Sequence, residues 1–209
     1  MKLRALVSCV ALVAALAVIN TLAQDKPASA KESKSTAAAP NQEEMMKKWM
    51  EIASPGPEHK AMEGWAGEWD VASKWRMAPD APPTESKGTS KVHPILGGRF
   101  MQEDHSGEMM GMPFTGIGIT GYDNMKKKYV SFWIDSGGTG MFTSEGTADS
   151  SGKVLTFEGK MDDPMTGEKD KPMKFIVRIV DANKHTFEMH DLSKGEKSLC
   201  GEMTYTRKK

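Results

Sequence analysis

The sequence predicts an all-β protein: an up-and-down antiparallel barrel of about ten strands, preceded by a short helix. Short runs with strand character fill the chain after Pro55, and Gly, Asn-Asp or Pro residues interrupt them at regular intervals. Most links have hairpin length, and no run is followed by a helical pattern, which argues against a parallel sheet. Such a meander must protect its edges, and closure into a barrel does so. A two-sheet sandwich is the alternative.

The start of the chain has the features of a secretory signal peptide over residues 1–23. Lys2 and Arg4 form a basic start, Ala5 to Ile19 is small or apolar, and Thr21-Leu22-Ala23 offers small residues at a cleavage site. The apolar stretch is shorter than the ~20 residues that a membrane-spanning helix needs. The sequence therefore predicts export to the periplasm or the extracellular space, without a lipid anchor and without a transmembrane segment in the mature chain.

Residues 24–55 form the expected tether, with a short helix at 43–53. The tether before the helix has no large apolar residue, so burial cannot offset the entropy lost on ordering it. Within the helix, apolar residues recur at spacings of three and four: Met45, Met46, Trp49, Met50 and Ile52. A helix this short is marginal alone, so we expect it to dock on the domain or to fray. The barrel domain then occupies residues 56–209.

Ten strands are expected after the helix, each ended by residues that favour turns. Their predicted ranges are 68–77, 85–93, 99–105, 114–122, 128–135, 140–147, 154–161, 172–180, 184–191 and 198–207. The first link contains Pro79, Pro82 and Pro83, which cannot lie in the interior of a hydrogen-bonded ladder. The later links are Gly97-Gly98, Asp123-Asn124, Gly137-Gly138, Ser150-Ser151-Gly152, the longer loop 162–171, Asp181-Ala182-Asn183 and Lys194-Gly195.

The charge balance argues against a nucleic-acid partner, and the cysteine content argues against an internal disulfide. The chain has 28 basic and 28 acidic residues, and without Lys2 and Arg4 the basic count is 26 against 28. A nearly neutral protein lacks the basic face that nucleic acids require, so no nucleic-acid partner is predicted. After signal removal Cys200 is the only cysteine, so a single chain has no internal disulfide and its core must hold the fold.

Several segments, in order, resemble a bacterial family catalogued only as a domain of unknown function. The segments are Pro57–Lys60, Gly64–Asp70, Ile95–Arg99 (ILGGR), Glu108–Phe114 (EMMGMPF), Gly116–Asn124, Trp133–Ser136 with Gly138–Gly140, and Asp163–Gly167. This family is grouped with the calycin, or lipocalin-like, barrels. The resemblance covers about residues 55–209; it implies a calycin-like barrel and no particular activity.

Gly67 and Trp69 also resemble the G-x-W motif that opens the first strand of lipocalins. In that family the Trp closes one end of the barrel, and an Arg of the last strand stacks on it. The resemblance implies that Arg207 takes this role here, where a desolvated cation–π contact would contribute ~0.5–2 kcal/mol. This role is structural, not catalytic.

A hollow barrel would need polar groups on its inner wall to orient a ligand. The candidate luminal residues are Trp133, Asp135, Thr143, Glu145, Glu188, His190 and Tyr205. The opposite strand faces carry apolar residues: Val130, Phe132, Ile134, Phe187 and Met189. Alternation alone does not decide which set points inward, although an apolar interior is the plainer arrangement.

Two cofactor hypotheses have weaker support. His105, Met109, Met110 and Met112 combine imidazole and thioether groups that suit Cu(I), but Met also fills apolar gaps, and this chain has 17 Met. Haem is suggested by analogy with nitrobindin-type barrels, which hold it through one His; His190 is the position to test. No histidine pair has the spacing of a zinc site.

We favour an exported, lipocalin-like protein that binds a small apolar or amphipathic ligand. No complete catalytic set is visible, so no catalytic residue is assigned. An enzyme using Asp135, Glu188 and His190 for acid–base chemistry is one alternative. An envelope interaction protein, using the tether and the helix at 43–53 to dock an unidentified protein, is the other.

Overall fold

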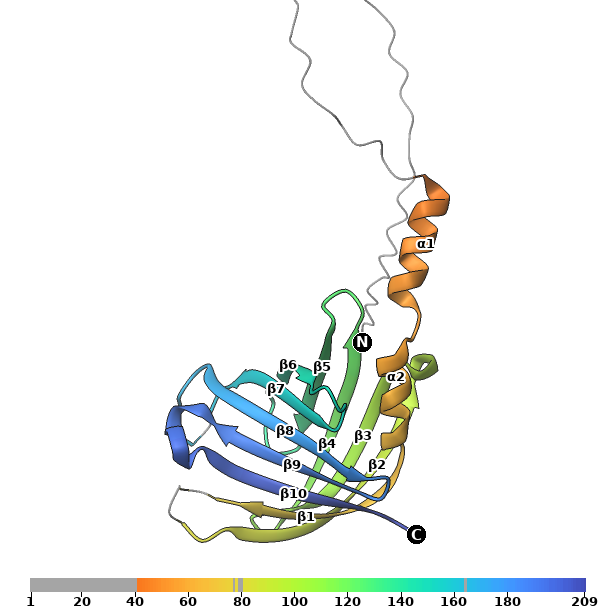
Figure 1. Ribbon diagram of the computed structural model, residues 1–209. Helices are drawn as coiled ribbons and strands as arrows, with labels where there is room; N and C mark the ends of the chain where they lie inside the picture. Colours follow the sequence, from red (N-terminus) through yellow and green to blue (C-terminus); the bar gives the residue numbers. More distant parts are fainter. Residues whose placement is uncertain (1–40, 77, 79–80, 164) are drawn as a thin grey trace, which may run out of the picture. The chain divides into compact units, whose positions relative to one another are not determined.

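The computed structural model describes residues 41–76, 78, 81–163 and 165–209 (Figure 1). The expected signal peptide and the tether up to residue 40 lie outside the described residues. Within them, α1 (Gln42–Ala53), α2 (Pro57–Met62) and a 3₁₀ turn η1 (Glu63–Trp65) precede ten strands. None of the described helices is long and apolar enough to cross a membrane.

The ten strands close into an antiparallel barrel, and the predicted fold class is confirmed (Figure 1). Each strand pairs with its neighbours in sequence, and β1 pairs with β10 to complete the ring. The strands are β1 (Gly67–Trp75), β2 (Thr84–Ile95), β3 (Phe100–Met109), β4 (Met112–Asp123), β5 (Lys128–Asp135), β6 (Phe142–Ala148), β7 (Val154–Met161), β8 (Lys171–Asp181), β9 (Lys184–Asp191) and β10 (Leu199–Arg207).

The strand registers determine which side chains point inward, because directly paired residues share a face. The buried core marks this inner face: Trp69, Val71, Val92, Met101, Tyr129, Leu155, Phe157, Met173, Phe175 and Tyr205 are all buried. Following the pairing around the ring places one continuous set of alternate residues inside.

One end of the barrel is closed by α2 and η1, and we call it the capped end. Met62 of α2 is fully buried, and His59 is buried with its Nδ1 accepting a hydrogen bond from the Gly56 amide at 2.9 Å. Trp65 of η1 packs against Tyr129. Pro57 occupies the first turn of α2, where its missing N–H costs nothing. The sequence interpretation did not include this helix.

Helix α1 is well capped but leaves its apolar face uncovered. Asn41 and Glu44 form a reciprocal capping box at its start. None of its residues is buried. Its contacts with the barrel are made by its last carbonyl groups: Asn124 donates to Ile52, and Arg99 donates to Ala53. The expected docking of this helix is therefore limited to its C-terminal end.

Aromatic rings lie against glycines on the inner wall. A side chain at Gly116 would overlap the ring of Trp133 from β5, and one at Gly201 would overlap the ring of Trp75. Glycine is required at both positions because the neighbouring ring occupies the space of a Cβ. The rings are thereby held along the wall instead of projecting toward the barrel axis.

Candidate functional site

Alternation left open which side chains of β5 and β9 face the barrel interior, and the structure shows that the two strands differ. On β5 the polar set points inward: Tyr129 is buried, Ser131 pairs with Ser144, and Trp133 lies over Gly116 and Gly118. On β9 the apolar set points inward, because Phe187 pairs with Val177 of β8 and stacks on Phe175. The two strands therefore present opposite chemical characters to the interior.

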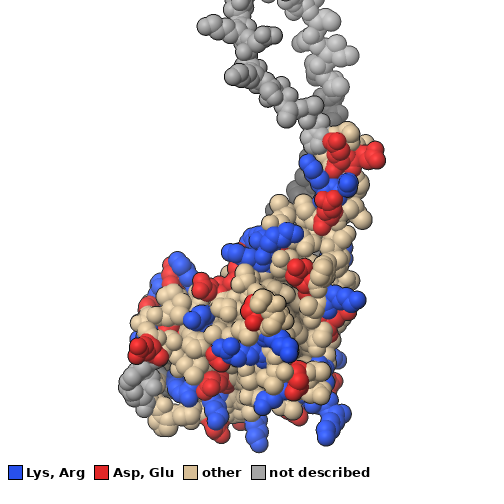
Figure 2. Space-filling model, viewed as in Figure 1, with Lys and Arg blue, Asp and Glu red and all other residues tan. Residues whose placement is uncertain are grey.

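Two of the candidate luminal residues on β6 lie on the outer surface instead. Glu145 accepts hydrogen bonds from Lys126 and Lys128, and these lower the pKa of its carboxyl. Thr143 is exposed. Both residues line an outer groove of about 690 Å³, walled by Phe100, Ile119, Val130 and Phe132. Charges of both signs are interspersed on the face shown in Figure 2.

The two candidates on β9 also face outward. His190 is held by Ser198 Oγ at 3.0 Å and by Glu188 Oε2 at 3.2 Å, so both ring nitrogens have partners. Glu188 in turn accepts from Arg178 at 3.2 Å. This arrangement separates Glu188 and His190 from Asp135, and it places His190 away from the interior where a haem would lie.

The centre of the interior contains an acid that the sequence interpretation missed, Glu103 of β3. Ser90 Oγ donates to its Oε1 at 2.7 Å, and the hydroxyl of Tyr205 donates to the same oxygen at 3.3 Å. These contacts join β2, β3 and β10 across the barrel. Alternation from the apolar Met101, two residues earlier, is the signal that could have placed Glu103 inside.

Glu103 sits in an environment that favours its neutral form. Burial raises the pKa of its carboxyl, against the opposing effect of the hydrogen bonds from Ser90 and Tyr205. Burial, with the adjacent Glu103, also raises the pKa of Tyr205 well above its ordinary value. Even so, Glu103 as a whole residue is only part-buried.

Farther from the capped end, β5 and β3 contribute Trp133, Asp135 and His105. The indole Nε1 of Trp133 donates to Asp135 Oδ2 at 2.7 Å, and the Gly137 amide donates to Oδ1 at 2.8 Å. The ring of His105 lies 6.0 Å from Phe114 and 6.4 Å from Trp133 between centroids. Burial lowers the pKa of His105, so its neutral form is favoured.

The four residues named for copper are not brought together. His105 pairs with Gly116, while Met109 pairs with Met112 at the β3–β4 turn. Met109 lies four positions after His105 along β3, which corresponds to about 13 Å along the strand. Met110 and Met112 are exposed. In addition, no group of three or more His, Cys, Asp or Glu side chains suited to a metal ion occurs among the described residues.

At the capped end, Arg207 lies over the indole of Trp69, 4.2 Å from its centroid. Its guanidinium also donates to the carbonyls of Gly64, Ala66 and Ala182. This is the arrangement that the G-x-W resemblance implied for Gly67, Trp69 and Arg207. The ring of His185 packs edge-on against Trp69 at 4.5 Å and stacks on Tyr205 at 4.3 Å.

His185 should make the protein sensitive to mild acid. Burial, with a smaller effect of Arg207, lowers its pKa to about 4. In the unfolded chain the His185 imidazole binds a proton as the pH falls below about 6.5, whereas in the folded protein it stays neutral down to about pH 4. The free energy of unfolding therefore falls as the pH drops from 6.5 toward 4. The expected loss by pH 5 is about 2 kcal/mol. His185→Phe should remove this part of the loss when urea unfolding is compared at pH 7 and pH 5. An equal loss in the variant would contradict the assignment.

The end opposite the cap carries a buried ion network. Lys171 Nζ lies 2.8 Å from Asp163 and 2.9 Å from Asp191, and all three residues are largely shielded from solvent. Asp163 belongs to the long β7–β8 loop, so the network ties this loop to the barrel wall.

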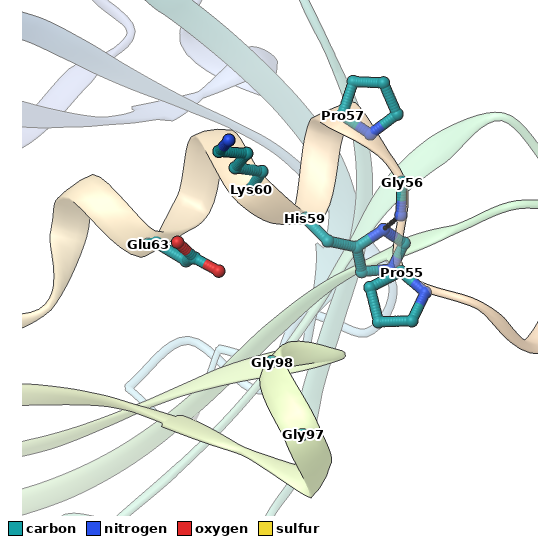
Figure 3. A pocket seen from close by; sticks show the side chains of 8 residues that line it. All are labelled: Pro55, Gly56, Pro57, His59, Lys60, Glu63, Gly97 and Gly98. Atoms are coloured by element: carbon teal, nitrogen blue, oxygen red, sulfur yellow. Dashed lines mark hydrogen bonds between the residues drawn. The ribbon is translucent and has the colours of Figure 1, made fainter.

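A surface pocket of about 490 Å³ lies between α2 and the Gly97-Gly98 turn (Figure 3). Lys60 and Glu63 are its charged lining residues, and both are exposed. The buried His59 ring faces it with Nδ1 already bonded to Gly56. This pocket offers fewer groups that could orient a ligand than the interior around Glu103.

Fold and interior together define a closed ten-stranded antiparallel barrel whose inner wall combines aromatic side chains with a few buried polar groups. The chain belongs to the family described as "Protein of unknown function (DUF1579)", whose model matches residues 54–207. The expected membership in a family of unknown function is thereby confirmed. No curated protein matches the chain.

Among solved structures, the chain is similar to Rv2717c from M. tuberculosis, with a TM-score of 0.55 and 15% identity over 75% of this chain and 100% of that one. This similarity supports the barrel fold. A redesigned beta barrel matches with a TM-score of 0.39 and 11% identity, over 75% of this chain and 100% of the other. The protein EF1p2_mFAP2b, bound to DFHBI, matches with a TM-score of 0.40 and 12% identity, over 72% and 99%.

Proposed function

We propose that this protein binds a small amphipathic molecule inside the barrel. The observation that carries the proposal is Glu103, a part-buried acid that Ser90 and Tyr205 hold in the middle of a largely apolar interior. Ligand sites have this composition, with apolar walls and a few placed polar groups.

Partial exposure of inner-wall residues supports a hollow interior. Trp133, Phe187, Met189 and Met203 belong to the inner face, and all are only part-buried. A core packed at native density would exclude water from such side chains.

Binding is favoured over acid–base catalysis because the residues named for catalysis are divided between two faces. Asp135 lies inside, whereas Glu188 and His190 are bonded to outer-surface partners. If residues 1–23 direct export as their pattern predicts, the ligand is encountered outside the cytoplasm.

A neutral apolar fluorophore, N-phenyl-1-naphthylamine, should bind with increased emission. Val177→Trp adds bulk on the inner face of β8 and should weaken this binding at least tenfold, because the interior is filled. Ile176→Trp places the same ring on the outer face of the same strand and should leave binding unchanged. Fluorimetric titration measures both.

Thermal unfolding of both variants provides the control for folding. Equal binding by wild type, Val177→Trp and Ile176→Trp would place the fluorophore outside the barrel. Absence of binding to the wild type would contradict the proposed function.

A further inference from the structure

We propose that the ligand carries a positive charge, as an amine or quaternary ammonium group, and that Glu103 is its counter-ion. This inference rests on the proposed function and specifies the chemical class of the ligand. Four features of the interior lead to it.

The first feature is an oxygen of Glu103 without a protein partner. Both hydrogen bonds to this carboxyl, from Ser90 and from Tyr205, end on Oε1. No side chain or amide among the described residues donates to Oε2. Oε2 is also not among the fully enclosed side-chain atoms that lack a hydrogen-bond partner, so it is not completely sealed from solvent. A buried carboxyl in native proteins normally has its acceptors satisfied.

The second feature is the lack of a lysine or arginine on the inner wall that is free to pair with Glu103. Lys171 and Arg207 are the Lys and Arg residues of the inner face in the part of the chain that the structure describes. Arg207 is committed to three carbonyls and Trp69, and Lys171 is committed to Asp163 and Asp191. Neither acts on Glu103, whose pKa is affected by burial, Ser90, Tyr205 and Asp104.

The third feature is a negative charge on the inner wall that no basic side chain neutralises. Asp135 adds a second inner-face carboxylate beyond Glu103, and its partners are the neutral donors Trp133 and Gly137. Neutral donors leave the negative charge uncompensated. An anionic ligand would meet repulsion in a site of low dielectric constant, whereas a cation would be attracted.

The fourth feature is an aromatic face beside the acid. Trp133 and the Cβ of Glu103 flank the same residue, Gly118, from opposite sides: the ring at 3.1 Å and the Cβ at 3.7 Å from where a Gly118 side chain would begin. Tyr205 bonds directly to Glu103. A carboxylate next to aromatic faces is the combination that recognises ammonium groups.

Binding of a cation should depend on pH through Glu103. The titratable groups around it are Tyr205 on β10 and Asp104 and His105 on its own strand, while β2 and β4 contribute Ser90 and Gly118, which do not titrate. The free protein favours the neutral acid, and a bound cation favours the carboxylate. Affinity for a cation should therefore rise as the pH rises through the pKa of Glu103, with release of a proton on binding.

The test compares three ligands with the same alkyl chain: decyltrimethylammonium, decanol and decanoate. Each displaces the neutral fluorophore from the wild-type protein below its critical micelle concentration. We expect the cation to bind at least tenfold more tightly than decanol, and decanoate to bind weakest. Glu103→Gln should abolish the preference for the cation and still bind the fluorophore, since the amide replaces a neutral acid of the same shape.

Glu108→Gln is the matched control. Glu108 lies on the same strand, faces outward and is exposed, so its removal should leave the preference for the cation intact. Decanol binding as tightly as the cation, or a preference unchanged in Glu103→Gln, would overturn the inference while the proposed function stands. If Glu103→Gln does not fold, the preference of the wild-type protein for the cation over decanol is measured as a function of pH. A preference that does not decrease at acid pH would contradict the inference.

Discussion

Replacing Trp69 with alanine is expected to lower the free energy of unfolding by about 3–5 kcal/mol. Trp69 is 2% exposed, and its indole N–H donates to the Trp65 carbonyl at 3.1 Å. The substitution opens a cavity at the capped end, leaves that carbonyl without its donor, and removes the ring on which Arg207 and His185 pack. Urea unfolding followed by circular dichroism measures the change.

Trp49→Ala is the matched control for this prediction. Trp49 lies on α1 and is 61% exposed, so the same deletion removes little buried surface. The two variants should differ in unfolding midpoint by a wide margin. Similar midpoints would mean that Trp69 does not hold the capped end together.

Replacing Lys171 with methionine is expected to cost about 3 kcal/mol of stability. The ammonium group compensates two carboxylates, Asp163 at 2.8 Å and Asp191 at 2.9 Å, and Asp191 is almost fully shielded from water. Methionine fills a similar volume but leaves both charges unpaired in a poorly solvated place. The β7–β8 loop should also become more accessible, which hydrogen exchange at the described loop residues can detect.

Lys169→Met is the control for Lys171→Met. Lys169 pairs with Asp162 in the same loop, but both side chains are largely exposed, so its removal should change the unfolding free energy little. If the two lysine variants are equally stable, the buried network contributes no more than a surface pair.

The same network predicts a loss of stability in acid. The bond from Lys171 lowers the pKa of Asp163 well below its usual range. Burial alone would raise the pKa of Asp191, but the hydrogen bonds from Ser193 and Lys171 lower it overall. Lowered carboxyl pKa values stabilise the folded state above the ordinary value of about 4, and this contribution is lost as the pH falls below it.

The fold could be predicted because its signals are local. Gly97-Gly98, Asp123-Asn124 and Asp181-Ala182-Asn183 all mark turns that the structure contains, and the runs between them form strands within a few residues of the predicted ends. The contact of Arg207 with Trp69 was predictable only through the resemblance of Gly67 and Trp69 to the G-x-W motif, which implied it.

The direction of the side chains could not be predicted from alternation on single strands. The apolar and polar residues of a strand alternate with the same period whichever set faces inward. Only the pairing with neighbouring strands therefore shows which set lies inside. A polar inner face is tolerated on β5 because partners across the wall satisfy it: Ser131 bonds to Thr120, and Trp133 to Asp135. On β9 the wall contributes apolar partners, Val177 and Met203, so Phe187 points inward.

Turn chemistry and strand periodicity, which act over a few residues, were therefore enough to specify a ten-stranded antiparallel barrel. The composition of its interior arises from contacts between segments far apart in the chain. Ser90, Glu103 and Tyr205 meet because β2, β3 and β10 are brought together by ring closure. No pattern within one strand encodes that meeting, since it depends on the register of every pair around the barrel.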